Sequence, residues 1–159
     1  MKLFLTSISM LFVFALVSCK SPQKAISGNY SYKTECLGME NDGSQTVKAW
    51  GNGRSRDEAV EDARKTAVRD VMFNGIRNGK PDCNVNPVVG EVNARDKYAE
   101  YFNKFFADKG AYTQFISEKY NMEVTKGAKQ AGVLETYGVI VRVLRQDLIV
   151  KMKNEGILK

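Results

Sequence analysis

Few residues of this chain of 159 could do chemistry at an active site. There is no histidine, which excludes the commonest general base and every Ser–His or Cys–His nucleophile pair. Asp57 with Glu61 and Glu58 with Asp62 form carboxylate pairs one helical turn apart. Such pairs on a solvent-exposed helix face seldom have pKa values raised enough for acid catalysis. We therefore expect a protein that is not an enzyme and has no catalytic residue.

Cys19 stands at the end of the one uniformly apolar stretch of the chain. Lys2 precedes an apolar run over residues 3–17, which is shorter than the roughly 20 residues of a membrane-spanning helix and ends in small residues, as an export signal does. The Leu-Val-Ser-Cys sequence that ends at Cys19 resembles the lipobox of bacterial lipoproteins, whose cysteine is acylated and begins the mature chain. The pattern predicts a signal peptide at residues 1–18 and a polar tether at residues 19–28. The alternative is an ordinary secretory signal with a chance cysteine.

Export also changes the meaning of the two other cysteines, Cys36 and Cys83. In an oxidising compartment an even pair can form a disulfide. Such a bridge would close a loop of nearly 50 residues, worth roughly 4 kcal/mol in the chain-entropy model. Two separate buried thiols are the alternative. The spacing is not that of a metal site and no histidine could complete one, so we expect neither a metal nor a cofactor.

Residues 29–159 are expected to form a single domain, since their number suits one hydrophobic core. Alternating strands around an Asp42-Gly43 turn predict a hairpin, and Ser55 with Glu58 forms a capping box that starts a helix. The fold class is α+β, with a small, mainly antiparallel sheet of about four strands packed against helices. The expected order is strands at 30–37 and 46–50, helices at 55–76 and 96–109, strands at 112–126 and 134–144, and a short helix ending at Gly156.

The predicted helix at 96–109 carries the densest aromatic segment of the chain. Its rings recur at i, i+3, i+4, i+7 and i+8, which places them on one face: Tyr98, Tyr101, Phe102, Phe105 and Phe106. Such a stripe usually belongs to a core. If left uncovered, it is the first candidate for a ligand-binding surface.

Three segments carry a resemblance to a known family. A glycine-bounded strand (VKAWGNG), an alanine-rich helix (EAVEDARKTAVRDV) and a long strand with a short closing helix (YGVIVRVLRQDLIVKMKNEGI) resemble the bacterial lipoprotein domain shared with the amino-terminal domain of flagellar assembly protein T. The match covers roughly residues 46–156. The resemblance implies a small α+β envelope module associated with outer-membrane assemblies and without catalysis, and it supplies no catalytic residue to carry over.

These observations together predict a non-enzymatic, lipid-anchored envelope protein that docks onto a protein assembly at the outer membrane. The alternative is a binding module that holds a small amphiphile or a glycan against the helix at 96–109. The chain has 24 Lys and Arg against 18 Asp and Glu, but the two signs alternate, so we expect no nucleic-acid partner. The partners expected are the membrane, through the lipid, and an envelope protein.

The side of the membrane is predicted from the residues after Cys19. Surface lipoproteins of one bacterial group resemble one another in carrying an acidic run there, whereas this chain has Lys20-Ser-Pro-Gln-Lys24. We therefore expect the protein to face the periplasm.

Overall fold

The structure is a computed structural model that describes residues 32–117, 124–127 and 134–159. The predicted signal peptide at 1–18, the tether at 19–28 and Cys19 itself lie outside the described residues. Within those three ranges, no helix is both long enough and apolar enough to span a membrane.

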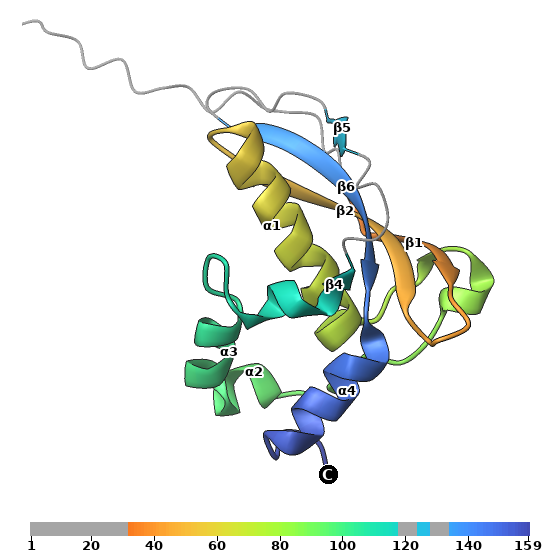
Figure 1. Cartoon of the computed structure of the whole chain (residues 1–159), viewed down its shortest axis with the longest axis vertical. Coiled ribbons are helices and arrows are strands. Elements are labelled where there is room, and N and C mark those ends of the chain that lie inside the picture. Colours follow the sequence, from red (N-terminus) through yellow and green to blue (C-terminus); the bar gives the residue numbers. More distant parts are fainter. Residues whose placement is uncertain (1–31, 118–123, 128–133) are drawn as a thin grey trace, which may run out of the picture.

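The body is α+β, with a mixed sheet in the order β3-β1-β2-β6-β4, and β5 also pairs with β6 (Figure 1). Neighbouring strands are antiparallel except β1 and β3, which are parallel. The described residues thus hold six strands where about four were expected. The strands are β1 (Glu35–Met39), β2 (Gln45–Gly53), β3 (Asn78–Gly79), β4 (Ile116–Ser117), β5 (Val124–Lys126) and β6 (Glu135–Val143).

The predicted leading hairpin is present, formed by β1 and β2 around a turn in which Gly43 has a φ of 76°. The strand expected at 46–50 is longer in the structure, because β2 continues past Trp50 to Gly53. Gly51 remains within β2, where its missing side chain leaves space for a helix to pack directly on the strand. A Cβ atom at Gly51 would fall 2.1 Å from the backbone nitrogen of Ala63.

The helix that lies on Gly51 is α1 (Arg56–Arg69), which crosses one face of β2 and β6 (Figure 1). The predicted capping box starts it: the Ser55 hydroxyl accepts a hydrogen bond from the Glu58 amide at 3.3 Å. The Glu58 carboxylate in turn accepts from the Arg54 amide at 2.8 Å. The small residues that face the sheet are fully buried: Ala59, Ala63 and Ala67.

Paired valines of β2 and β6 complete this core. Val47 lies opposite Val141, and Ala49 lies opposite Val139, all four buried. Alternate residues of a strand share a face, so this register directs both rows toward α1. β6, at the position of the strand predicted at 134–144, is central, since β2 pairs along one edge and β4 and β5 along the other.

The first predicted helix does not continue unchanged to Ile76. After Arg69 the chain forms a π-helical turn, η1 (Asp70–Asn74), and stops at Gly75, whose φ is 66°. The closing helix α4 (Arg145–Asn154) stops before Gly156, as predicted, where a φ of 69° suits glycine.

Two other expectations about the helices and strands were wrong. The aromatic segment forms two short helices, α2 (Ala94–Lys97) and α3 (Ala99–Phe105), because Tyr98 leaves helical geometry with a ψ of 32°. The strand predicted at 112–126 is present only in part, as β4 and β5, and the stretch begins instead as a 3-10 turn, η3 (Ala111–Phe115). A spacing of three in a 3-10 turn eclipses Tyr112 and Phe115, and both enter the core. Two positions on which that strand rested, 120 and 122, lie outside the described residues.

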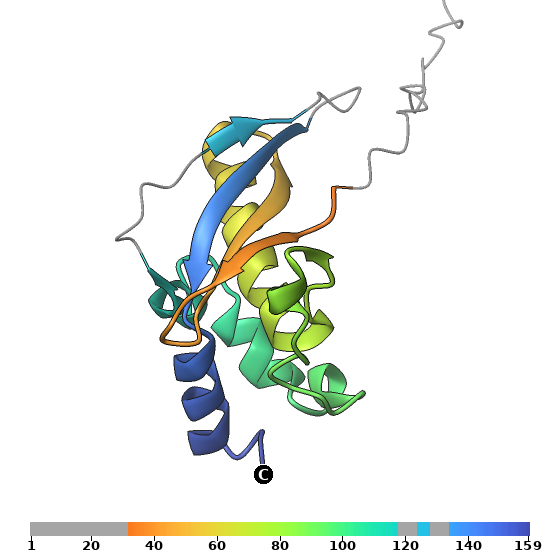
Figure 2. The ribbon, with the colours of Figure 1, turned by 90° about the vertical axis from the view of Figure 1, so that its right-hand side faces the viewer.

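Figure 2 shows that α2, α3 and α4 gather at the end of the sheet where α1 finishes. The π-helical turn therefore meets three other elements, and the candidate site lies at this junction.

Candidate functional site

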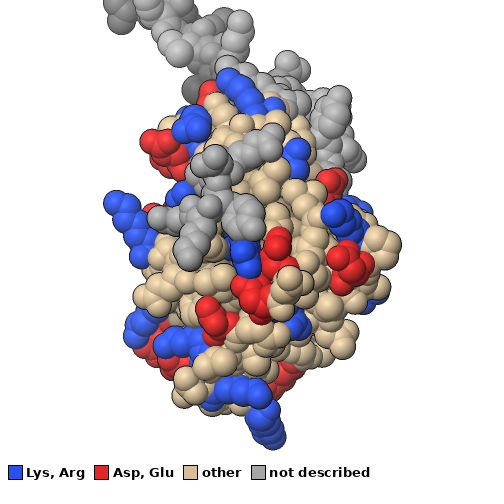
Figure 3. Space-filling view, turned by 45° about the vertical axis from the view of Figure 1, so that its right-hand side comes forward, with Lys and Arg blue, Asp and Glu red and all other residues tan. Residues whose placement is uncertain are grey.

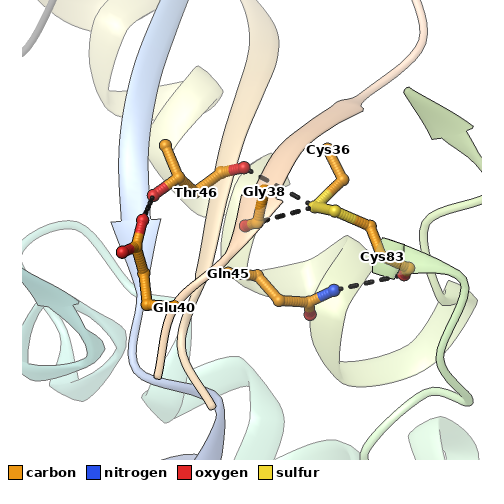
Figure 4. Close-up of a disulfide and its surroundings, with 6 residues drawn as sticks. All are labelled: Cys36, Gly38, Glu40, Gln45, Thr46 and Cys83. Carbon is orange, nitrogen blue, oxygen red and sulfur yellow. Dashed lines mark hydrogen bonds between the residues drawn. A yellow bond between two sulfur atoms is a disulfide. The ribbon is translucent and has the colours of Figure 1, made fainter. Parts of the chain in front are cut away.

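The first predicted pair, Cys36 and Cys83, is joined in the structure as a disulfide with Cα atoms 5.9 Å apart (Figure 4). Cys36 lies on β1 and Cys83 ends a 3-10 turn, η2 (Pro81–Cys83), and both are fully buried. The Gln45 side chain, 1% exposed, donates to the Cys83 carbonyl at 3.5 Å. The bridge therefore holds the loop after α1 against the outer strand of the hairpin.

The backbone beside the disulfide is also closely packed. Gly79 has a φ of 100°, and a Cβ atom there would fall 2.1 Å from the Cys36 carbonyl oxygen. The Lys80 amide donates to that same oxygen at 3.0 Å. This short parallel pairing could not be predicted from the local sequence, because it joins residues about 40 positions apart beside the disulfide.

The predicted aromatic face divides between core and surface. Phe102 and Phe105 are 6% and 3% exposed. Phe105 packs on Phe115 with ring centroids 5.7 Å apart, and Phe102 meets Phe73 edge-on at 4.8 Å. Two of the five predicted ligand-binding rings therefore serve the hydrophobic core.

The other three rings are half-buried: Tyr98, Tyr101 and Phe106. The Tyr101 hydroxyl is buried and has no hydrogen-bond partner among the described residues. Burial, with a smaller contribution from the nearby Glu155 carboxylate, raises the pKa of Tyr101 to about 12. The phenol is therefore neutral at physiological pH.

A groove of about 400 Å³ opens where the end of α1 and η1 face α2 and α3. We call it the arginine–aromatic groove. It is lined by Arg69, Phe73, Arg95, Asp96, Ala99, Phe102, Asn103 and Phe106. Only Phe102 and Phe106 among these belong to the predicted set. Phe102 contributes little surface, so Phe73 and Phe106 supply most of the aromatic lining.

Two guanidinium groups lie over the rings of this groove. The Arg95 guanidinium carbon is 4.4 Å from the centroid of Phe73, and that of Arg69 is 5.6 Å from the centroid of Phe106. Arg95 also donates to the Asn74 side-chain oxygen at 3.1 Å. Stacking uses the flat face of a guanidinium, whereas carboxylates bind along its N–H edge. The groove therefore combines aromatic surface with groups suited to bind an anion.

The π-helical turn η1 gives the groove its shape. The Asp70 carboxylate accepts hydrogen bonds from the Thr34 hydroxyl and, at 2.6 Å, from the Asn74 side chain. Val71 and Met72 remain in the core, while Phe73 turns toward α3. Such turns within helices occur often at functional sites. Sequence analysis missed Phe73, although its spacing of four from Arg69 places the two on one helical face.

The two carboxylate pairs noted in the sequence lie along the outer face of α1, in a groove of about 650 Å³. Their carboxylates contact neighbouring groups: Asp62 accepts from the Asn52 amide at 2.9 Å, and Glu61 accepts from the Tyr112 hydroxyl. Glu61 also lies 3.7 Å from Arg64. These contacts give the carboxylates a structural role in joining α1 to β2 and η3.

Charged side chains of both signs share the surface of the body. Figure 3 shows Lys and Arg side chains mixed with Asp and Glu on the face in view. In the described ranges, no group of histidine, cysteine, aspartate and glutamate residues is arranged to hold a metal ion.

No family model, curated protein or solved structure matches this chain. The resemblance to the domain shared with flagellar assembly protein T therefore stays a prediction. The function is inferred from the residues of this chain.

Proposed function

We propose that this protein is a non-enzymatic, lipid-anchored envelope protein that docks onto a protein assembly at the outer membrane and faces the periplasm. In this proposal Cys19 carries the lipid, residues 19–28 tether the body, and the body provides the docking surface. The partners are the membrane, through the lipid, and an envelope protein.

The observation that carries the docking function is the burial of two of the five predicted aromatic rings, Phe102 and Phe105. A module that captures an amphiphile or a glycan needs a concave pocket that covers most of its ligand. Phe102 and Phe105 are instead packed into the core, and half of the residues that line the groove beside Phe102 are exposed along its rim. This arrangement supports docking over capture of a small molecule, which was the alternative expected from the helix at 96–109.

The Cys36–Cys83 disulfide supports the compartment. Structural disulfides persist in oxidising environments such as the bacterial periplasm and are rare in the cytosol. A disulfide in the body agrees with an export signal before it.

The test is co-purification from the native envelope. The full chain, tagged at its carboxyl end, is extracted in mild detergent beside a Cys19→Ala variant. We expect one or a few envelope proteins to co-purify with the unaltered chain at constant stoichiometry. The variant should be absent from the membrane fraction and should co-purify with none of these partners. A chain that purifies alone over a range of mild detergents would contradict the proposal.

A further inference from the structure

Arg69 and Arg95 flank the arginine–aromatic groove and lie over two of its rings, Phe106 and Phe73. Asp96 is the one acidic residue in the lining, so the two guanidiniums leave the groove with an excess of positive charge. Aromatic residues and arginine are the types enriched in protein–protein interfaces and in their energetic hot spots. The groove therefore has the composition of a docking surface for an anionic partner.

We propose that this groove is the surface on which the envelope partner docks, and that the docking segment of the partner carries a carboxylate beside apolar side chains. The inference depends on the docking function proposed above and names its site. The carboxylate is bound by the N–H edges of the two arginines, while the apolar side chains cover Phe73 and Phe106.

The openness of the groove favours a protein segment over a free small ligand. Arg95, Asp96, Ala99 and Asn103 are all exposed, so half of the lining lies along the rim. A free amphiphile would keep much of its apolar surface in water there. A segment belonging to a folded partner is held in place by the remainder of that partner, so a shallow groove suffices for it.

The test uses the full chain in its native envelope, with a photo-reactive phenylalanine analogue in place of Asn103 at the groove. The matched control carries the analogue at Asn41, an exposed residue in the turn between β1 and β2. We expect Asn103 to cross-link to an envelope protein and Asn41 not to. The cross-linked peptide, read by mass spectrometry, should contain an aspartate, a glutamate or a terminal carboxylate beside apolar residues.

A pair of charge variants tests the role of the arginines. Arg69→Met with Arg95→Met removes both guanidiniums but keeps apolar side chains over the rings. Arg54→Met with Arg56→Met removes the same charge at the other end of α1. We expect the groove pair to lower the cross-link yield about tenfold or more and the control pair to leave it unchanged, since charge-assisted hydrogen bonds are lost only in the first. Thermal melts check that both variants fold.

The outcomes distinguish a failure of the groove assignment from a failure of the docking function. If the protein still co-purifies with its partner but cross-links from Asn41, or equally well without Arg69 and Arg95, docking stands and the groove assignment is refuted. A cross-link from Asn103 to a lipid or a small molecule alone refutes it too. If the unaltered chain purifies without any partner, the docking function fails and the inference fails with it.

Discussion

Removing the Cys36–Cys83 disulfide should lower the free energy of unfolding by about 4 kcal/mol. The two residues are 47 apart in sequence, and the chain-entropy model gives a loop of that length about 4 kcal/mol at 25 °C. For a body of this size the loss corresponds to a fall in melting temperature on the order of 10–15 °C. The full burial of both side chains means that truncation to alanine adds a small packing cost.

The assay is urea unfolding of a Cys19→Ala background, in which the bridge cysteines are the only thiols. The oxidised protein is compared with the same protein reduced and with a variant that also carries Cys36→Ala and Cys83→Ala. Hydrogen exchange should show the loop around η2 opening before β2 and β6. If reduction and the alanine variant both change stability by less than about 1 kcal/mol, the bridge does not constrain the unfolded chain as reasoned.

Three further predictions concern the packing and the titratable groups. Gly51→Ala should destabilise the body by about 3 kcal/mol in urea unfolding, because its Cβ atom would fall 2.1 Å from an α1 backbone nitrogen. The control Gly90→Ala, whose Cβ atom has no neighbour within 4 Å, should leave the free energy of unfolding unchanged. Equal effects of the two substitutions would contradict this close packing. The Arg142 guanidinium and Ser44 hydrogen-bond to Asp42 and hold the pKa of its carboxyl well below the ordinary value. An NMR titration should therefore find the Asp42 carboxyl ionised well below pH 4, and Arg142→Met should raise its pKa. An unshifted titration of Asp42 in the unaltered chain would refute the ion pair. Burial raises the pKa of Tyr101 to about 12, so the phenol is neutral below pH 10 and its ionisation lowers the stability of the fold between pH 10 and pH 12. Tyr101→Phe should remove this loss of stability without weakening the fold at pH 7. A clear drop in the free energy of unfolding of this variant at pH 7 would reveal a hydrogen-bond partner for the hydroxyl.

The elements with strong local signals could be predicted from sequence. The capping box at Ser55 starts α1, the turn at Gly43 closes the hairpin, and Gly156 follows the last helix. Each signal is contained within a few residues, so a single chain is enough to read it. The sequence of β6 also agrees with its central place, because both faces of the strand carry apolar residues.

The errors arise where tertiary contacts override the local pattern. Gly51 looked like a strand end, but it continues β2 because α1 needs its missing side chain. The stripe from Tyr98 to Phe106 fitted one helix, yet the chain breaks at Tyr98. β3 pairs with β1 at the point where the disulfide also joins the loop to Cys36, a long-range contact that no local pattern signals.

The residues of the arginine–aromatic groove also divide into those that the sequence could predict and those that it could not. Its floor ring Phe102 was in the predicted set, and Arg69 with Phe73 could have been found from their helical spacing. Arg95 could not, because the loop between η1 and α2 brings it to the Phe73 ring, and the path of that loop has no local signal. A π-helical turn has no reliable signal in a single sequence, so the site it shapes had to come from the structure.

The docking function and its compartment both depend on export and lipid anchoring, so the most direct measurement is the mass of the amino-terminal peptide of the protein taken from native membranes. We expect that peptide to begin at Cys19 and to carry the added mass of fatty acyl chains. An unmodified Cys19, or a chain that still begins at Met1, would contradict the lipid anchor and with it the proposed place of this protein in the envelope.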